Sequence, residues 1–392
     1  LVSINVSNNT SLEELLIINN QLSSLNVSNN PSLKRLFCQR NQLTSLDLTN
    51  NNVLENLDFH QNELVNLDVS SNPDLVTLVA YQNELISIDI SNNPLIENLN
   101  IWGNQITTVD LSNNLNLKWL DINNMQVASL DVSANTNLLQ LICDNNLLTG
   151  LDVSTNTALT HLQARSNQLT SIDVSNNTAL SVLRLMDNQI TALDVSTNTA
   201  LTLLQVEDNQ LTSLNVDNNT NLEELRLNYN QLTELDVTNN TAIERLEIAS
   251  SNLTSLNVSA NTALTWLDCN DNQLETLDVS NNIVLDYLHC NNNQITTLDL
   301  SANTVLSYLW CQSNQLNYLN IKNGVNSYFE FNTTNNPLAC IETLNPDHAS
   351  DNYTYENGNI DNGVTFEFIC GSEARTNWHV STTGSDISGS GI

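Results

Sequence analysis

The chain has 392 residues, of which 40% are hydrophobic but only 5% aromatic, so it can bury a sizeable core that must be aliphatic. Asp and Glu number 43 against 10 Lys and Arg, and the formal net charge of -33 repels nucleic-acid phosphates and anionic membranes, so neither is an expected partner. Because no apolar run approaches the ~20 residues of a membrane-spanning helix, no membrane insertion is expected.

An asparagine followed two residues later by Leu or Ile recurs along most of the chain. It returns every 21 residues, at Asn20, Asn41, Asn62, Asn83, Asn104, Asn146, Asn167, Asn188, Asn209, Asn230, Asn272, Asn293 and Asn314. Met125 and Ser251 take the same place in two further copies, and after Asn314 the phase slips by one residue, to Asn336. Sixteen coils can therefore be counted, and residues 1–336 are predicted to form one solenoid.

Each coil carries six apolar positions in the pattern LxxLxCxxNxLxxLDVSxNT, of which residues 264–283 are a clean copy. The LxC part alternates with a period of two, which predicts a short strand. The LDV part alternates as well, so the opposite side of the coil is a second candidate for extended chain. No coil has room for a helix of ordinary length. A single coil cannot bury its own apolar face, but a stack of coils can.

The repeated asparagines have a structural explanation. Where a strand ends and the chain bends away, buried backbone groups lose their ladder partners and need others. An Asn amide both donates and accepts, so the anchors are predicted to bridge neighbouring coils, with gaps at Met125 and Ser251. A second column is predicted to do the same at the other bend, and it runs through Asn30, Asn51, Asn72, Asn93 and onward.

This in-phase motif resembles the leucine-rich-repeat family, and more narrowly its nested 21-residue class of bacterial extracellular proteins, LxxLxCxxNxLxxLDLxxN. The resemblance covers about residues 1–340. It implies a curved right-handed solenoid, mostly β with little or no helix, and a parallel sheet on its concave face. By analogy it also implies a binding role.

The chain changes texture after Asn336. A solenoid end exposes an apolar coil face that needs a cover, so residues 337–370 are predicted to be a C-terminal cap. Within it Val364, Phe366 and Phe368 alternate like a closing strand. Residues 371–392 are predicted to be a linker and the start of a following module. The phrase WHVSTTGSD at residues 378–386 resembles the opening of right-handed parallel β-helix modules in secreted bacterial proteins.

The seven cysteines divide into two groups. Cys340 and Cys370 flank the cap, and we predict a disulfide between them, which fits an oxidising, secreted or cell-surface location. The other five share one core slot of the coil and are predicted to be free thiols, because parallel side chains in one column have poor disulfide geometry. They are Cys38, Cys143, Cys269, Cys290 and Cys311.

An aspartate column also runs along the coils. It comprises Asp47, Asp68, Asp89, Asp110, Asp131, Asp152, Asp173, Asp194, Asp236, Asp278 and Asp299. Like charges stacked at ~4.8 Å repel one another, so something must compensate. One interpretation is hydrogen bonding from adjacent Ser/Thr hydroxyls and backbone N–H groups. The other is Ca²⁺ bound between coils, with Asp47, Asp68, Asp89 and Asp110 as candidate ligands. No other cofactor is expected.

The concave face is the second candidate site. Its outward residues are expected one, two, four and six places before each anchor. Nine of the ten aromatic residues in residues 1–317 fall in those slots: Phe37, Tyr81, Trp102, Trp119, Tyr229, Trp266, Tyr287, Tyr308 and Trp310. So do all six arginines of that segment: Arg35, Arg40, Arg165, Arg184, Arg226 and Arg245.

These side chains are expected to form two aromatic zones with arginines between them. The first zone is His60, Tyr81 and Trp102 with Trp119 beside them, and the second is Trp266, Tyr287 and Tyr308 with His289 and Trp310. Arg165, Arg184, Arg226 and Arg245 lie between. Exposed Trp, Tyr and Arg are typical of binding hot spots. Cross-strand aromatic and Arg–Glu pairs also stabilise a sheet by themselves, so both interpretations stand.

Catalysis is not expected. No GxSxG, HExxH, P-loop or GxGxxG motif occurs, and with 9 Gly in the chain no phosphate-cradling loop is available. His60, His161 and His289 fall on distant coils, too far apart for a triad or a shared metal. We therefore predict a monomeric, non-catalytic extracellular recognition or adhesion module that holds a protein or a glycan on its concave face. The alternative is a structural spacer, stiffened by calcium, that presents another module at the cell surface.

Overall fold

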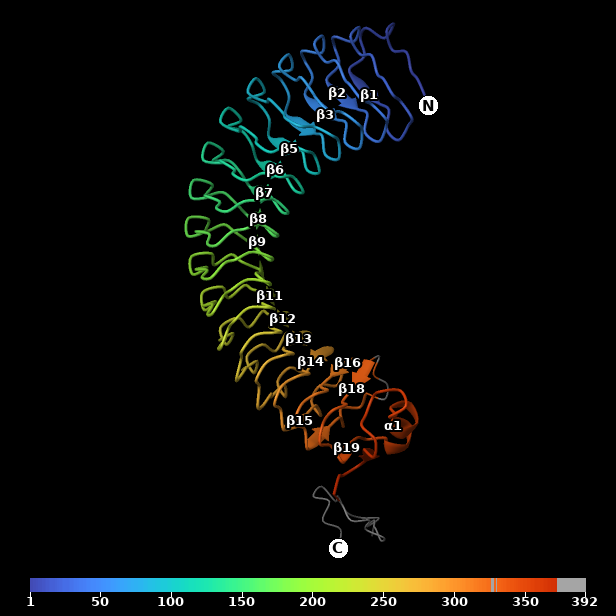
Figure 1. Ribbon diagram of the computed structural model, residues 1–392, viewed down its shortest axis with the longest axis vertical. Coiled ribbons are helices and arrows are strands. Elements are labelled where there is room, and N and C mark those ends of the chain that lie inside the picture. Colours follow the sequence, from blue (N-terminus) through green and yellow to red (C-terminus); the bar gives the residue numbers. More distant parts are fainter. Residues whose placement is uncertain (326–327, 329, 372–392) are drawn as a thin grey trace, which may run out of the picture.

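The computed structural model describes residues 1–325, residue 328 and residues 330–371. The chain winds into a long curved solenoid, with the N-terminus at one end and a small cap near the other (Figure 1). A parallel sheet of 16 strands lines the inner side of the arc. Its strands are β1 (Glu14–Leu16), β2 (Arg35–Phe37), β3 (Asn56–Asp58), β4 (Thr77–Val79), β5 (Asn98–Asn100), β6 (Trp119–Asp121), β7 (Gln140–Ile142), β8 (His161–Gln163), β9 (Val182–Arg184), β10 (Leu203–Gln205), β11 (Glu224–Arg226), β12 (Arg245–Glu247), β13 (Trp266–Asp268), β14 (Tyr287–His289), β16 (Tyr308–Trp310) and β18 (Glu330–Asn332).

The predicted solenoid is confirmed, together with its parallel sheet and its repeat length. Neighbouring strands pair with a shift of one repeat, as in Leu15↔Leu36 and Leu36↔Leu57. The slipped phase is confirmed too, because β16 pairs with β18 through Tyr308↔Glu330. The extra residue falls between these two strands, and the strands pair in the same register as the others.

The core follows the apolar pattern of the repeat. In the second coil Leu33, Leu36, Cys38 and Leu43 are completely buried. The middle residue of each strand points inward, while the first and last residues face the concave surface, so three-residue strands suffice to place one side chain inside and two outside. Phe59, the tenth aromatic residue of the segment, takes the slot that Cys38 takes one coil earlier and is also completely buried.

The anchor asparagines form the predicted ladder. Asn41 donates from Nδ2 to the carbonyl oxygens of Ile17 (2.8 Å) and Cys38 (3.0 Å), and its Oδ1 accepts from the N–H of Leu22 at 3.1 Å. One side chain therefore joins its own coil to the preceding one. Asn336 makes the same bonds after the slipped phase, because its Oδ1 accepts from the N–H of Leu316 at 3.0 Å.

The second asparagine column is equally structural. Asn51 is fully buried and donates from Nδ2 to the carbonyl oxygens of Val27 (3.1 Å) and Asn30 (2.9 Å) in the preceding coil. The same pair of bonds recurs through Asn303. At both bends of the coil, amide side chains therefore form hydrogen bonds with the neighbouring coil.

The residue before each anchor has a backbone conformation that the sequence pattern did not predict. It lies in the left-handed region in every coil, with φ between 50° and 57° at the fifteen non-glycine positions and 67° at Gly103. This conformation turns the chain away from the strand and into the bend. Because Arg40, Gln61 and Tyr229 occupy the position as well as glycine and asparagine, residue type does not reveal it.

A second, smaller sheet forms opposite the concave one at the C-terminal end. It contains β15 (Thr297–Asp299), β17 (Tyr318–Asn320), β19 (Cys340–Glu342) and β20 (Thr365–Glu367), in that order and all parallel. Across the described residues the LDV segment pairs into strands only here. The expectation of extended chain on the second side is therefore met in the last coils.

The end of the solenoid is covered by a short helix and a cluster of rings. Helix α1 (Pro346–Asn352) begins after Asn345, whose side chain accepts from the N–H of His348. Tyr353 follows α1, and its ring lies 4.6 Å from that of Phe331 and 6.3 Å from that of Phe366 in β20. The expected closing strand is thus present as β20, with Phe366 buried and Phe368 exposed.

The cysteine predictions are confirmed. Cys340 and Cys370 form a disulfide with Cα atoms 5.8 Å apart, and the other five cysteines are free and buried. Burial raises the pKa of the Cys38 thiol to about 12, so these thiols stay protonated and unreactive in the folded chain. The predicted linker and β-helix-like phrase at 378–386 lie outside the described residues. In the part of the chain that is described, no helix is long and apolar enough to cross a membrane.

Candidate concave binding face

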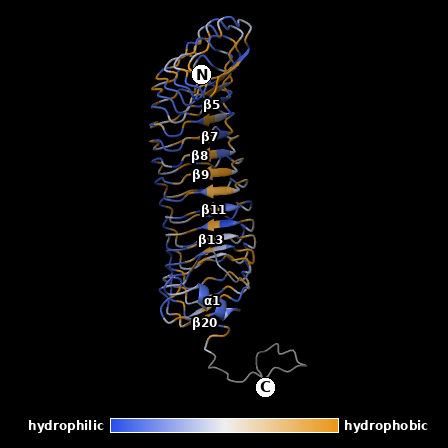
Figure 2. Ribbon diagram, turned by 90° about the vertical axis from the view of Figure 1, so that its right-hand side faces the viewer, coloured by the Kyte–Doolittle hydropathy of each residue, from blue (hydrophilic) through white to orange (hydrophobic). Residues whose placement is uncertain are grey.

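Three columns of outward side chains run along the concave sheet, which faces the viewer in Figure 2. We call the first residue of each strand the entry column and the last residue the exit column. The residue two places before each anchor, just beyond the strand, forms the bend column. All fourteen residues predicted to bind a ligand lie in these columns, since the register of the sheet places each of them one repeat from its neighbours.

The first aromatic zone is a stack in the bend column. The ring centroids of His60 and Tyr81 are 4.1 Å apart, and those of Tyr81 and Trp102 are 4.9 Å apart, with the planes within 12° of parallel. His60 Nδ1 lies 2.7 Å from Asp58 Oδ1, which orients the ring at the end of the stack. Trp119 lies in the entry column instead and is 39% exposed. The predicted stack is therefore present, and Trp119 belongs to a different column one coil after Trp102.

The second aromatic zone spans the entry and exit columns. Trp266 and Tyr287 stack with centroids 3.4 Å apart, and Tyr308 continues the row 5.6 Å from Tyr287. His289 and Trp310 pack beside them from the exit column, with centroids 5.1 Å apart. The five rings of this zone therefore form one continuous surface. Phe37 lies far from it, in β2, and makes no ring contact with any residue that the structure describes.

Three of the four arginines between the two zones are held by acidic neighbours. Arg165 Nε lies 3.1 Å from Asp144 Oδ2, and Arg226 pairs with Glu224. Arg245 pairs with Glu247, and its guanidinium lies 4.1 Å above the Trp266 ring. This contact joins the charged network to the second aromatic zone. The contacts of Arg165 with Asp144 and of Arg245 with Trp266 join neighbouring coils, so the pairing between coils that competes with binding as an explanation is present in the folded sheet.

Three carboxylates on this face are buried or partly buried, and their altered titration was not predicted from the sequence. Burial raises the pKa of Asp121 to about 6 and that of Glu207 to about 7. Burial also raises the pKa of Asp144, although the bond from the Arg165 N–H and the charge of Arg165 oppose it. Because carboxylates normally titrate near pH 4, Asp121 and Glu207 change charge much closer to neutral pH than an exposed carboxylate does. Their place in the exit and bend columns was readable from the repeat, but their desolvation by neighbouring coils was not.

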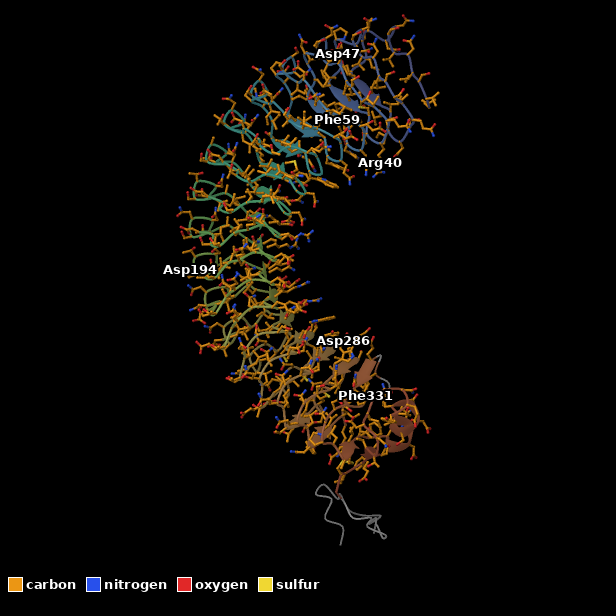
Figure 3. All side chains as sticks on the ribbon, viewed as in Figure 1. Arg40, Asp47, Phe59, Asp194, Asp286 and Phe331 are labelled. Carbon is orange, nitrogen blue, oxygen red and sulfur yellow. A yellow bond between two sulfur atoms is a disulfide. The ribbon has the colours of Figure 1, made fainter. Side chains whose placement is uncertain are left out.

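The aspartate column lies on the other side of the molecule. Figure 3 shows Asp47 and Asp194 on the outer side of the arc, while Arg40 and Asp286 lie on the inner side. Asp47 Oδ1 accepts from the N–H and hydroxyl of Thr49 at 3.0 and 2.7 Å. These bonds lower the pKa of the Asp47 carboxyl, and the charge of Asp68 raises it only slightly. The compensation expected from adjacent Ser and Thr residues is therefore observed.

No catalytic centre was expected from the sequence, and calcium between coils was one of two interpretations of the aspartate column. Over residues 1–325, 328 and 330–371, no group of three or more His, Cys, Asp or Glu side chains is arranged to hold a metal ion. His60, His161 and His289 follow or belong to strands five or more positions apart in the sheet, so they do not meet.

The comparisons with known proteins agree with the repeat architecture. No model of a known protein family matches the chain, and no curated protein matches it. A solved structure does: the functional domain of InlJ from Listeria monocytogenes is 34% identical, with a TM-score of 0.75 over 80% of this chain and 71% of that one. The chain belongs to the leucine-rich-repeat family.

Two other solved structures share the fold at lower identity. A leucine-rich-repeat protein of Leptospira interrogans is 23% identical, with a TM-score of 0.73 over 86% of this chain and 88% of that one. A plant peptide hormone receptor, RGFR1 in complex with RGF2, is 17% identical, with a TM-score of 0.70 over 86% of this chain and 65% of that one. The InlJ domain includes a cysteine ladder, and in this leucine-rich-repeat chain Cys269, Cys290 and Cys311 line up in successive coils.

Proposed function

We propose that this leucine-rich-repeat chain is a non-catalytic recognition module that binds a protein along its concave face. The observation that carries the proposal is the gathering of accessible rings and arginines on that single face. Trp119 is 39% exposed there, and Tyr229 is 59% exposed. Residues of these types dominate the energetics of protein interfaces.

The packing of the rings favours a protein over a glycan. Sugars bind aromatic side chains through the flat face of the ring, but in each zone one ring has both faces covered by neighbouring side chains. Tyr81 is stacked on both sides, by His60 and Trp102. Trp266 lies between Arg245 and Tyr287. The edges that remain suit the side chains of a protein surface. The plant receptor of the same fold, which holds RGF2, supports this choice.

We further propose a secreted or cell-surface location for the module. The Cys340–Cys370 disulfide supports it, since such bonds persist in oxidising compartments. The similarity to the InlJ domain of Listeria monocytogenes supports a bacterial origin of the same class. Residues 1–336 would then be the recognition solenoid and residues 337–370 its cap.

A structural spacer is the second candidate function, because the rings and ion pairs of the concave face also satisfy one another. The two functions are separated by replacing Tyr81, Trp102 and Trp119 with Ala and probing an array of cell-surface proteins and glycans. Recognition predicts that array binding is lost while the melting temperature falls by only a few degrees. Tyr355→Ala, which removes a ring that is 58% exposed in the cap, is the control and should leave binding intact. A large loss of stability without any binding phenotype would support the spacer.

A further inference from the structure

A groove crosses the entry edge of the concave sheet from β9 to β13. It encloses about 390 Å³ and is lined by Val182 and Leu203 at one end, by Glu223 and Glu244 along its rim, and by Arg245 and Trp266 at the other end. Its chemistry deepens the proposed function, on which this inference rests, because it indicates what kind of protein segment fits.

The single cation that lines the groove is already neutralised. Arg245 pairs with Glu247, and its guanidinium stacks on Trp266. Glu224, which also lines the groove, accepts from Gln205 Nε2 at 2.8 Å and pairs with Arg226. These four charged groups form a closed network of two carboxylates and two guanidinium groups, so they attract no further ion.

Glu223 and Glu244 are different. They occupy the position immediately before the strand in adjacent coils, and the N–H of Glu244 donates to the carbonyl oxygen of Glu223 at 2.9 Å. Both side chains are exposed, and neither forms an ion pair with any described residue. Two unpaired carboxylates therefore stand side by side over the groove.

Glutamates at the same position of other coils form ion pairs with lysines. Lys118 Nζ lies 2.8 Å from Oε2 of Glu97 in the preceding coil, and Lys34 Nζ lies 3.6 Å from Oε2 of Glu13 in its preceding coil. In both cases a lysine fills the place beside the glutamate. At Glu223 and Glu244 the neighbouring residues of this column are Thr202 and Thr265, which carry no charge.

The groove also offers an apolar wall for the stem of a long cation. Val182 and Leu203 are the only aliphatic residues of the entry column between β1 and β18, and both are half-buried. A lysine or arginine side chain can lie with its methylene groups on such a wall while its charged end reaches a carboxylate.

We infer that this groove receives a basic segment of the protein partner, in which a Lys or Arg lies next to an apolar residue. The cation contacts Glu223 and Glu244, and the apolar side chain packs on Val182 and Leu203. Five strands at ~4.8 Å spacing give a groove of roughly 19 Å, the length of about six extended residues. The net charge of -33 steers such a segment toward the solenoid from a distance.

The test uses the full chain and a fluorescein-labelled hexapeptide of alternating Leu and Lys, with fluorescence anisotropy as the readout. A second peptide with every Lys acetylated keeps the shape and removes the charge. The variant is Glu223→Gln/Glu244→Gln. The matched control is Glu234→Gln/Glu275→Gln, which removes two exposed carboxylates away from the concave sheet. We expect the Lys peptide to bind the wild type and the control alike, and Glu223→Gln/Glu244→Gln about tenfold more weakly.

Three results would overturn the inference: equal binding of the Lys peptide to all three proteins, undiminished binding of the acetylated peptide, or no binding at millimolar peptide. The first would show only general attraction to an acidic surface. None of them bears on the proposed function, which is judged by the array and the aromatic variants. Conversely, a partner that needs Tyr81 and Trp102 but tolerates Glu223→Gln/Glu244→Gln would support the function and defeat this inference.

Discussion

The two flawed anchors show how much one side chain contributes to the coil stack. At an intact anchor the Asn Oδ1 accepts the N–H of the coil before it, as Asn272 does for Leu253 at 3.0 Å. Ser251 is too short to reach, so its buried hydroxyl and the N–H of Leu232 have no hydrogen-bond partner among the described residues. An unsatisfied buried donor costs about 1–3 kcal/mol.

Ser251→Asn should therefore stabilise the chain by about 1–2 kcal/mol, since it restores the missing acceptor. The measurement is the midpoint of urea unfolding followed by circular dichroism. Asn272→Ser, the mirror-image change one coil later, should destabilise by a similar amount. If Ser251→Asn lowered the midpoint, the missing hydrogen bond would not be the defect at this position.

Asp121 makes stability depend on pH in an unusual direction. Its pKa in the folded chain is raised by burial from 3.8 to about 6, so the folded state binds the proton more tightly than the unfolded state. The charged form of Asp121 lowers the free energy of unfolding. This loss of stability is absent below about pH 4, grows as pH rises, and is complete above pH 6.

Asp121→Asn should raise the stability at pH 7 by about 2–3 kcal/mol and give no gain near pH 3.5. The amide keeps the acceptor that the N–H of Asn123 uses at 3.2 Å. Urea midpoints measured from pH 3.5 to pH 8 test this, with Asp47→Asn as the comparison. Hydrogen bonds lower the pKa of Asp47, so replacing this carboxylate with an amide should destabilise the folded chain above pH 4. A gain from Asp121→Asn that did not vary with pH would rule out titration as the cause.

At the scale of the element, the cap protects the last coil. Its strands β19 and β20 extend the second sheet, and the ring of Tyr353 packs on Phe331, the buried residue of the last concave strand. The Cys340–Cys370 disulfide closes a loop with a sequence separation of 30 residues. Restricting a loop of that size in the unfolded state is worth about 4 kcal/mol.

Replacing both cap cysteines with Ser should loosen residues 337–370 and leave the middle coils intact, because repeats contact only their neighbours. Hydrogen exchange read by mass spectrometry should show faster exchange in the cap alone. Thiol titration of the native wild type should find no reactive cysteine, since the five free thiols are buried, and all five should react in urea. Fast exchange throughout the solenoid would show that the cap controls global stability.

At the scale of the molecule, charge and curvature act together. The arc places the concave sheet inside, so the coils lie closest together on that side (Figure 1). Asp47 and Asp194 of the aspartate column lie on the outer side (Figure 3). A net charge of -33 opposes this compact stack by self-repulsion. The rare cations lie where they pair with nearby carboxylates, as Arg226 and Arg245 do.

Raising NaCl from about 20 mM to about 0.5 M should therefore raise the melting temperature by several degrees, because salt screens repulsion between exposed charges. Calcium should add nothing beyond its ionic strength, since the outer aspartates already accept bonds from their own Ser and Thr neighbours. Melting curves with EDTA, Mg²⁺ and Ca²⁺ at matched ionic strength measure both effects. A rise specific to Ca²⁺ would restore the calcium interpretation of Asp47, Asp68, Asp89 and Asp110.

The sequence by itself determined the repeat, and the repeat determined most of the fold. A period of 21 residues with six apolar positions is buried by stacking the coils, and Asn41 and Asn51 bond as their chemistry predicts. The columns of the concave face followed from the same register. The cap disulfide was also predictable, because Cys340 and Cys370 are the two cysteines outside the core slot.

Only the tertiary structure decided what those columns do to one another. Whether rings of one column stack face to face, as those of His60 and Tyr81 do, depends on how neighbouring coils orient them. The raised pKa of Asp121 and the unpaired state of Glu223 depend on atoms from adjacent coils. A repeat fixes where each side chain points, but desolvation, ring contact and charge pairing arise between residues 21 apart, and their strength depends on distances that the sequence does not contain.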